Sequence, residues 1–274
     1  MALLGRRLAV SIPDTVLEEK ESLREKTAKL GLIARACAIY GVDVIEVFRD
    51  PKGRGEGKTI REVLEYLETP QYLRRKLYPI DETLKFAGVL PPLRIPSHKP
   101  RVSVDRISPG EVREGVVNDD GSVDVGLDVA PRLSSDAQPG RRVTVRVTSM
   151  KPPRADIVAK GSLREYWGYT VETKQLDDVF ADSRFRAKVA TSRLGTPLPK
   201  ALDRLRTLLE GGDGMKLLFG SPSRGLFEIV GRELDRRVDL VLNLFPAQQV
   251  ESVRTEEALF AGLGVVSLVS AEKA

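Results

Sequence analysis

Three segments near the C-terminal end of the chain combine glycine or proline with small polar residues. They are residues 191–195 (TSRLG), 219–225 (FGSPSRG) and 243–255 (NLFPAQQVESVRT). Glycine allows a ligand to approach the backbone closely, but neither the G-x-G-x-x-G pattern nor a Walker sequence occurs, so the common dinucleotide and phosphate loops are not indicated. The third segment is long for a connection, and its mixture of apolar and polar residues suits an amphiphilic ligand with a flat ring.

Histidine and cysteine occur once each, as His98 and Cys37. One cysteine cannot form an intramolecular disulfide, and so few soft ligands make a zinc site within the chain unexpected. His98 lies between prolines, where a hinge or packing role is predicted, and Cys37 falls on the apolar face of a helix. The residue types therefore favour chemistry that uses neither a metal ion nor a histidine base.

The elements that would position the three segments alternate between strand and helix. Apolar strands are predicted at residues 7–12, 42–48, 186–192, 215–220 and 238–245. Helices are predicted between a cap at Asp14 or Thr15 and a stop at Gly41, and at residues 59–67, around 74–76, and at 198–211, 223–234 and 255–264, the last capped by Thr255. This alternation predicts an α/β fold with a covered parallel sheet. Each of the three segments follows a strand, and ligands bind beyond the carboxyl ends of such strands.

The texture of the sequence changes in the middle of the chain. Residues 90–100 (LPPLRIPSHKP) are predicted to be a linker, and residues 101–160 hold short Val-rich alternating runs around a DG turn. Such runs indicate a small antiparallel β-barrel of the OB-like kind. We therefore expect a discontinuous α/β domain at 1–95 and 161–274, with an inserted RNA-binding β domain at 96–160.

Positive charge is concentrated in and just after this β region. The chain carries a net charge of +5, and residues 132–164 contain eight Lys or Arg against two Asp, whereas residues 111–128 are acidic. A localised basic face indicates a polyanionic partner, although a solvated basic surface is the alternative. The RNA-binding candidates are Arg141, Arg142, Arg146, Lys151 and Arg154. Tyr166, Trp167 and Tyr169 could stack on an unpaired base, with core packing as the safer interpretation.

The sequence shows no membrane span and no signal peptide, which favours the cytoplasm. No stretch approaches 18 consecutive apolar residues, so no membrane span is expected. The N-terminal sequence MALLGRRLAVSIPD lacks the apolar core and cleavage site of a signal peptide. We expect a cytoplasmic protein with no membrane partner.

The run NLFPAQQVESVRTEEALFAGLGVVSL, with LLFGSPSRGL and ATSRLG upstream, resembles the archaeal and eukaryotic SPOUT RNA methyltransferases that carry an inserted OB-like domain. The resemblance covers nearly the whole chain, and the C-terminal run NLFPAQQVESVRTEEALFAGLGVVSL is its most specific motif. It implies an α/β trefoil knot and a homodimer. It also implies methyl transfer from S-adenosylmethionine, leaving S-adenosylhomocysteine, to a nucleotide of rRNA or tRNA, with uridine N3 as one acceptor. No metal ion is expected.

The three segments match the cofactor-binding loops of that family in order. The implied cofactor-binding residues are Thr191, Ser192, Gly195, Phe219, Gly220, Ser221, Pro222, Gly225, Asn243, Leu244, Phe245, Pro246, Gln248, Val250, Val253 and Thr255. One position departs from the family, which often has Gly where this chain has Gln249, and a Cβ there is expected to narrow the pocket.

Catalytic candidates are arginines of the three segments. Arg193 could stabilise a developing anion or hold a phosphate. Arg224 and Arg254 follow, either for catalysis or for RNA phosphate, with a structural ion pair as the alternative for each. Glu256 or Glu257 could act as a base, but a helix-cap role is favoured. Two other functions stay open: a non-catalytic RNA-binding module that acts in ribosome assembly, and a different α/β enzyme with a nucleotide ligand.

Overall fold

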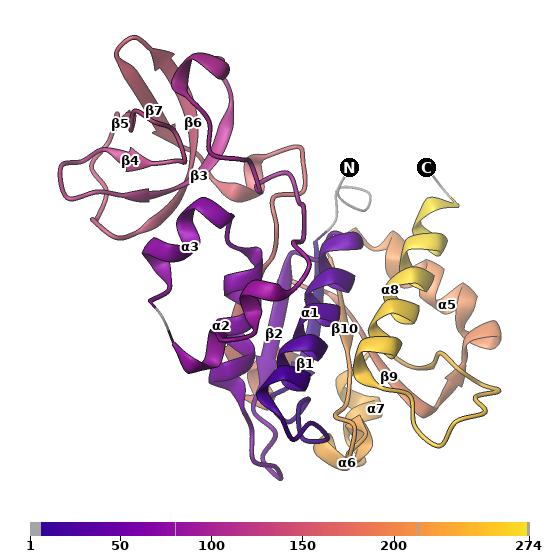
Figure 1. The fold of residues 1–274 in the computed structure, drawn as a ribbon. Coiled ribbons are helices and arrows are strands. Elements are labelled where there is room, and N and C mark those ends of the chain that lie inside the picture. Colours follow the sequence, from indigo (N-terminus) through magenta and orange to yellow (C-terminus); the bar gives the residue numbers. More distant parts are fainter. Residues whose placement is uncertain (1–6, 80, 213, 273–274) are drawn as a thin grey trace. The chain divides into compact units, whose positions relative to one another are not determined.

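The fold is taken from a computed structural model that describes residues 7–79, 81–212 and 214–272. The chain divides into two compact units (Figure 1). Unit 1 consists of Met1–Glu65, Thr83–Pro91 and Tyr169–Ala274, and unit 2 of Tyr66–Glu82 and Pro92–Gly168. None of the helices in the described ranges combines the length and apolar character that a membrane span requires.

Unit 1 is built on a six-stranded parallel sheet with the order β11-β9-β10-β1-β2-β8. The strands are β1 (Leu8–Pro13), β2 (Val44–Phe48), β8 (Thr170–Lys174), β9 (Ala187–Pro197), β10 (Met215–Leu218) and β11 (Leu240–Asn243). β1, β2 and β10 are buried along their whole length, as expected for parallel strands covered on both faces. The predicted parallel sheet is therefore confirmed, with β8 as an edge strand that the sequence did not reveal.

Helices cover this sheet. They are α1 (Leu23–Ile39), α2 (Gly57–Glu68), α4 (Leu176–Ala181), α5 (Leu198–Glu210), α6 (Leu226–Val230), α7 (Leu234–Arg237) and α8 (Thr255–Ala271). α8 packs against α1 and α5, and Figure 1 shows α1 and α8 side by side over the sheet. Cys37 is fully buried on α1, which confirms its predicted place in the core.

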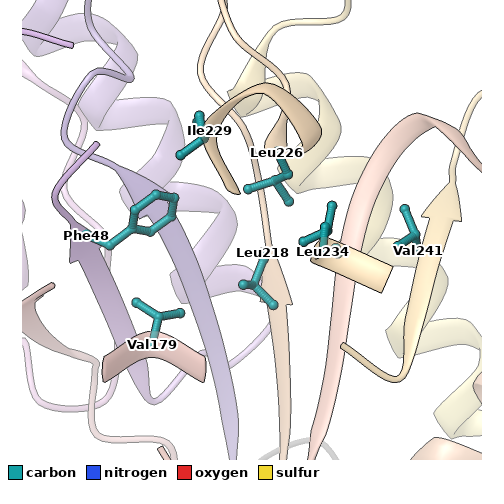
Figure 2. Packing of buried hydrophobic residues seen from close by; sticks show 8 residues of the cluster. Phe48, Val179, Leu218, Leu226, Ile229, Leu234 and Val241 are labelled. Atoms are coloured by element: carbon teal, nitrogen blue, oxygen red, sulfur yellow. The ribbon is translucent and has the colours of Figure 1, made fainter. Parts of the chain in front are cut away.

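A buried cluster supports the part of the sheet from which the three segments emerge (Figure 2). Strands contribute Phe48, Ala190, Leu218 and Val241, and the short helices α4, α6 and α7 contribute Val179, Leu226, Ile229 and Leu234. Ala190 and Leu218 directly precede the first segment and the start of the second. The cluster thus holds those segments on a rigid base.

Several predicted element boundaries were wrong. Helix α1 begins after Ser22, whose hydroxyl and the Glu25 carboxylate form a capping box, and not after Asp14 or Thr15. The helix predicted at 223–234 is two helices, because Gly231 adopts φ +90° between them. The last helix continues to Ala271, through Gly264.

Unit 2 contains a five-stranded sheet with the order β4-β3-β6-β7-β5. Its elements are α3 (Gln71–Leu77), β3 (Val112–Val117), β4 (Val123–Asp124), β5 (Arg132–Leu133), β6 (Arg142–Met150) and β7 (Pro153–Ile157). All pairs are antiparallel except β5 with β7, which is parallel. A bridge between Ser122 and Arg132 links the two ends of the sheet, so the barrel is nearly closed. Valines such as Val143 and Val145 fill its interior. Short 3-10 turns lie in unit 2 at Val104–Arg106 and Lys160–Ser162, in unit 1 at Ala87–Val89, and at the boundary between the units at Glu82–Leu84.

Candidate active site

The three segments enclose one cavity of about 400 Å³ in unit 1. It lies where β9, β10 and β11 end, at the carboxyl edge of the sheet, and its volume is typical of a small-molecule site. The lining residues are Thr191–Leu194, Phe219–Ser223, Gly225, Phe227, Glu228, Asn243–Phe245, Gln248, Glu251–Val253, Thr255 and Ala258. The three segments therefore meet at the carboxyl ends of the strands, where ligands bind in such sheets.

The first segment bulges out of the sheet within β9. Ala190 pairs with Val241, but the next pair along the ladder joins Thr196 to Leu242, so residues 191–195 loop out opposite two consecutive residues of β11. Gly195 ends the bulge against the backbone of β11, where an added Cβ would lie 2.6 Å from the Val241 carbonyl oxygen. The hydroxyl of Thr191 anchors the other end by donating to the Leu218 carbonyl at 3.0 Å.

The second segment is a tight turn between β10 and α6. The Ser221 hydroxyl accepts a hydrogen bond from the Arg224 amide at 3.0 Å, which closes the turn. A Cβ on Gly220 would lie 2.8 Å from the Arg224 carbonyl, so glycine is required by the close approach of the backbone. The Glu228 carboxylate accepts from the Gly225 amide at 3.0 Å and so caps α6.

Arg224 fastens the second segment to the loops that follow β1 and β2. Its guanidinium donates to the buried Asp50 carboxylate at 2.8 Å and to Glu18 at 2.9 Å. Thr15 also donates to Asp50, at 3.1 Å. Burial alone would raise the pKa of Asp50, but the Lys52 amide and the Arg224 guanidinium outweigh burial and hold this pKa below its usual range. Arg224 thus forms the structural ion pair that was the alternative to a catalytic role.

The third segment is tied to the other two. The Asn243 amide donates to the Arg193 carbonyl at 2.9 Å, and its oxygen accepts from the Phe245 amide at 3.0 Å. The Thr255 hydroxyl donates to the Gly220 carbonyl at 3.2 Å. Thr255 is therefore not the N-cap that the sequence suggested. Arg254 occupies that position, and Glu257 accepts from its amide at 2.9 Å.

Most of the predicted cofactor residues line the cavity. Gly195, Pro246 and Val250 are the predicted residues outside the lining, and Gly195 instead sets the shape of the bulge. Gln249 is exposed and donates to the Ala247 carbonyl at 3.0 Å, so it does not narrow the cavity as expected.

The two catalytic candidates have different positions. Arg193 is exposed and lines the cavity, whereas Arg254 lies outside the lining. The candidate bases Glu256 and Glu257 also lie outside it. Glu256 is buried beside Lys29, with 3.1 Å between the ammonium and the carboxylate, and Glu257 caps α8. The structure therefore leaves Arg193 as the candidate that faces the cavity.

Sequence reasoning missed several lining residues: Leu194, Ser223, Phe227, Glu228, Glu251, Ser252 and Ala258. Glu251 and Ser252 lie in the middle of the third segment, so their place in that long loop was the available signal.

In unit 2 the basic candidates are not equivalent. Arg142 lies in an ion-pair network, 2.7 Å from both Glu68 and Glu114, which makes it part of the framework of the barrel. Arg141, Arg146, Lys151 and Arg154 are exposed.

Two of the three aromatic candidates and the histidine have packing roles, whereas Tyr166 is half-buried. Trp167 is buried and donates to Glu114 at 2.6 Å, and Tyr169 is buried in unit 1, where it donates to the Leu64 carbonyl at 2.9 Å. His98 lies 2.8 Å from the Glu68 carbonyl, and burial lowers its pKa to about 4. The packing roles predicted for Trp167, Tyr169 and His98 are confirmed.

Comparison with known proteins places this chain in a family. Residues 7–266 match the family described as "Putative RNA methyltransferase". A protein of Haloarcula marismortui is 36% identical over 95% of this chain and 98% of its own length. The human 28S rRNA (uridine-N(3))-methyltransferase is 33% identical over 94% of this chain and 77% of its own. The Drosophila melanogaster protein of the same name is 29% identical over 94% of this chain and 61% of its own.

The parallel sheet and the match over nearly the whole chain define an RNA-modifying enzyme of the methyltransferase class. The chain belongs to this family of RNA methyltransferases, which confirms the resemblance found in the sequence.

Proposed function

We propose that the cavity binds S-adenosylmethionine and that the protein transfers its methyl group to N3 of a uridine in rRNA. The observation that carries the proposal is the closure of three segments around a single cavity at the carboxyl edge of a parallel sheet. The methyl donor supplies the reactive group, so the protein has only to position the two partners and control charge. The proposed acceptor is the one named for the human and Drosophila melanogaster relatives, which are 28S rRNA (uridine-N(3))-methyltransferases.

Within this proposal each segment has a role. Leu244 and Phe245 are half-buried and offer apolar surface for an adenine ring, and the turn at Gly220 leaves the backbone open for polar contacts with the donor. Arg193 faces the cavity, where its guanidinium would stabilise the negative charge that develops on the uracil carbonyls. Titration calorimetry with S-adenosylmethionine and S-adenosylhomocysteine tests the pocket, and absence of binding by either compound would refute it.

We further propose that the segment after β11 passes through a loop of the chain as a trefoil knot. The proposal is supported by the way Asn243 and Thr255 fasten that segment to the first and second segments. An experimental structure whose C-terminal backbone is unthreaded would contradict it.

We propose that the active protein is a homodimer. α1 and α8 pack against each other, and they expose Leu32, Ile39 and Leu268, which are 49%, 54% and 66% accessible. A second copy would cover these apolar side chains. Light scattering at micromolar concentration should give a mass of about 60 kDa, twice the 30.2 kDa of one chain. A mass of one chain at that concentration would contradict the dimer.

Unit 2 is proposed to dock RNA as an OB-like barrel. Arg132 and Arg154 are exposed and paired in register on β5 and β7, and like charges in such positions destabilise a sheet unless an anion lies between them. Arg141 and Arg146 add exposed charge just before β6 and in its middle.

The triple variant Arg141→Ala, Arg146→Ala, Arg154→Ala should weaken RNA binding and reduce the slope of log affinity against log salt by about 3, because each phosphate contact releases about one counterion. Affinity for S-adenosylmethionine should not change. The matched control replaces three exposed cations of unit 1, Arg24, Lys58 and Arg232. If the control variant lost the affinity and the triple variant kept it, unit 2 would not be the docking element.

A further inference from the structure

Most polar side chains of the cavity are already engaged in holding its walls. Thr191 bonds to Leu218, Asn243 to Arg193 and Phe245, and Thr255 to Gly220. The same is true of Ser221, Ser223, Glu228 and Gln248. Among the described residues that line the cavity, three functional groups make no such bond: the Arg193 guanidinium, the Glu251 carboxylate and the Ser252 hydroxyl.

The two carboxylates of the cavity lining differ in whether they accept a hydrogen bond from the protein. Glu228 and Glu251 are the acidic residues of the lining. Glu228 is committed to the cap of α6, and Glu256, at the start of α8, faces the buried ammonium of Lys29. Glu251 is exposed to the cavity and only its backbone carbonyl is used, by the Gln248 amide at 3.2 Å. It is the acidic group of the lining that is free to exchange a proton with a substrate.

We propose that Glu251 is the general base of the methyl transfer. The inference rests on the proposed function, because uridine N3 carries a proton and its nitrogen becomes a strong nucleophile only when that proton leaves. The Glu251 carboxylate takes the proton from N3, and N3 forms a bond to the methyl carbon as the bond from that carbon to sulfur breaks. The sulfonium becomes a neutral thioether, and the proton stays on Glu251 until it is lost to water.

The three uncommitted groups also match the edge of uracil. That edge presents an acceptor at O4, a donor at N3 and an acceptor at O2. Arg193 and Ser252 are donors and the Glu251 carboxylate is an acceptor. Cytosine presents an unprotonated N3 beside a donor amine, so the same set of groups favours uracil over cytosine.

The variant Glu251→Gln keeps the size of the side chain and removes the base. We expect single-turnover methyl transfer to fall by about 10²–10⁴-fold, the usual contribution of a positioned base. The affinity for S-adenosylmethionine should stay within about twofold, since the side chain supports no other group of the structure. The matched control is Glu21→Gln, an exposed glutamate outside the cavity, which should methylate at the wild-type rate.

Two readouts separate a base from a merely structural residue. The rate of Glu251→Gln should rise steeply with pH, because N3 must then lose its proton to solvent, whereas the wild-type rate should change much less. RNA that carries 5-fluorouridine at the target has a more acidic N3, so it should narrow the difference between variant and wild type.

Each result has a distinct meaning. If wild type forms 3-methyluridine and Glu251→Gln does so at the same rate with the same pH profile, the role of Glu251 is overturned and the proposed function stands. An unchanged difference on 5-fluorouridine RNA also overturns that role. If wild type forms no 3-methyluridine while S-adenosylmethionine binds, the proposed acceptor is wrong and the role of Glu251 falls with it.

Discussion

Replacing Arg193 with alanine should slow methyl transfer by about 10²–10³-fold, the loss usually seen when one donor to a developing oxyanion is removed. Arg193 is exposed at the cavity, and its backbone is held by the bond from Asn243, so the side chain can be removed without unfastening the bulge. The affinity for S-adenosylmethionine should change little, because the proposed role of Arg193 is to stabilise charge that develops on the acceptor. Single-turnover rates and calorimetry on the same preparation measure the two quantities.

Two further variants make this result specific. Arg193→Lys keeps the charge but loses the planar fork, and should recover part of the lost rate. Arg204→Ala removes an exposed arginine of α5 outside the cavity and should leave the rate unchanged. A variant Arg193→Ala that loses donor affinity and rate in equal proportion would show that the residue binds the donor.

The variant Gly195→Ala should lose at least tenfold in affinity for S-adenosylmethionine. Its Cβ would lie 2.6 Å from the Val241 carbonyl oxygen and 2.9 Å from the Leu242 nitrogen, and neither backbone atom can move without shifting β11. The bulge would be displaced instead, and Thr191 and Ser192 would move away from their places in the cavity wall. Overpacking of this kind costs about 1–3 kcal/mol of stability, so the melting temperature should also fall.

Gly225→Ala is the matched control for stability, because nothing lies within 4 Å of the Cβ it would add. It should melt at or slightly above the wild-type temperature. A Gly195→Ala protein that binds the donor as tightly as wild type would show that the shape of the bulge does not matter for the pocket.

Most strands of the parallel sheet could be predicted from the sequence, because they are short runs of apolar residues. β1, β2 and β10 are short apolar runs buried throughout, and such runs are visible without a structure. β8 was not predicted, because its sequence TVETK is half exposed at the edge of the sheet and has no apolar run. The barrel strand β5 was missed for a similar reason, since it is only the two residues Arg132–Leu133.

Two glycines were assigned the wrong position relative to a helix. Gly264 was expected to end the last helix, but it lies inside α8, where an added Cβ would meet the Tyr40 hydroxyl at 3.2 Å. Gly231 was placed inside a helix and in fact ends one, with φ +90°. Whether a glycine permits a turn or a close approach depends on its neighbours in space, which a single sequence does not reveal.

Ion pairs between distant parts of the chain were equally hidden. Glu46 and Lys216 lie in apolar strands and are fully buried, 2.8 Å apart, and Lys174 completes the group. Arg224 was a candidate for catalysis and Arg142 a candidate for RNA binding. In the structure, Arg224 pairs with Asp50 and Arg142 pairs with Glu68. Ligands bind beyond the carboxyl ends of parallel strands, and this rule predicted which loops would meet. Which side chains stay free in the cavity depends on the hydrogen bonds around it, and a sequence alone does not show these bonds.

We propose that this protein methylates uridine N3 in rRNA with S-adenosylmethionine as donor. The most direct test incubates the purified protein with isotopically labelled S-adenosylmethionine and ribosomal RNA, digests the RNA, and identifies the labelled nucleoside by mass spectrometry. Transfer RNA in a parallel reaction tests the other substrate class. We expect labelled 3-methyluridine from rRNA, absent when Arg193→Ala replaces the wild type over the same interval. Label in a ribose-methylated nucleoside, in another base, or in no nucleoside at all would contradict the proposed methylation of uridine N3.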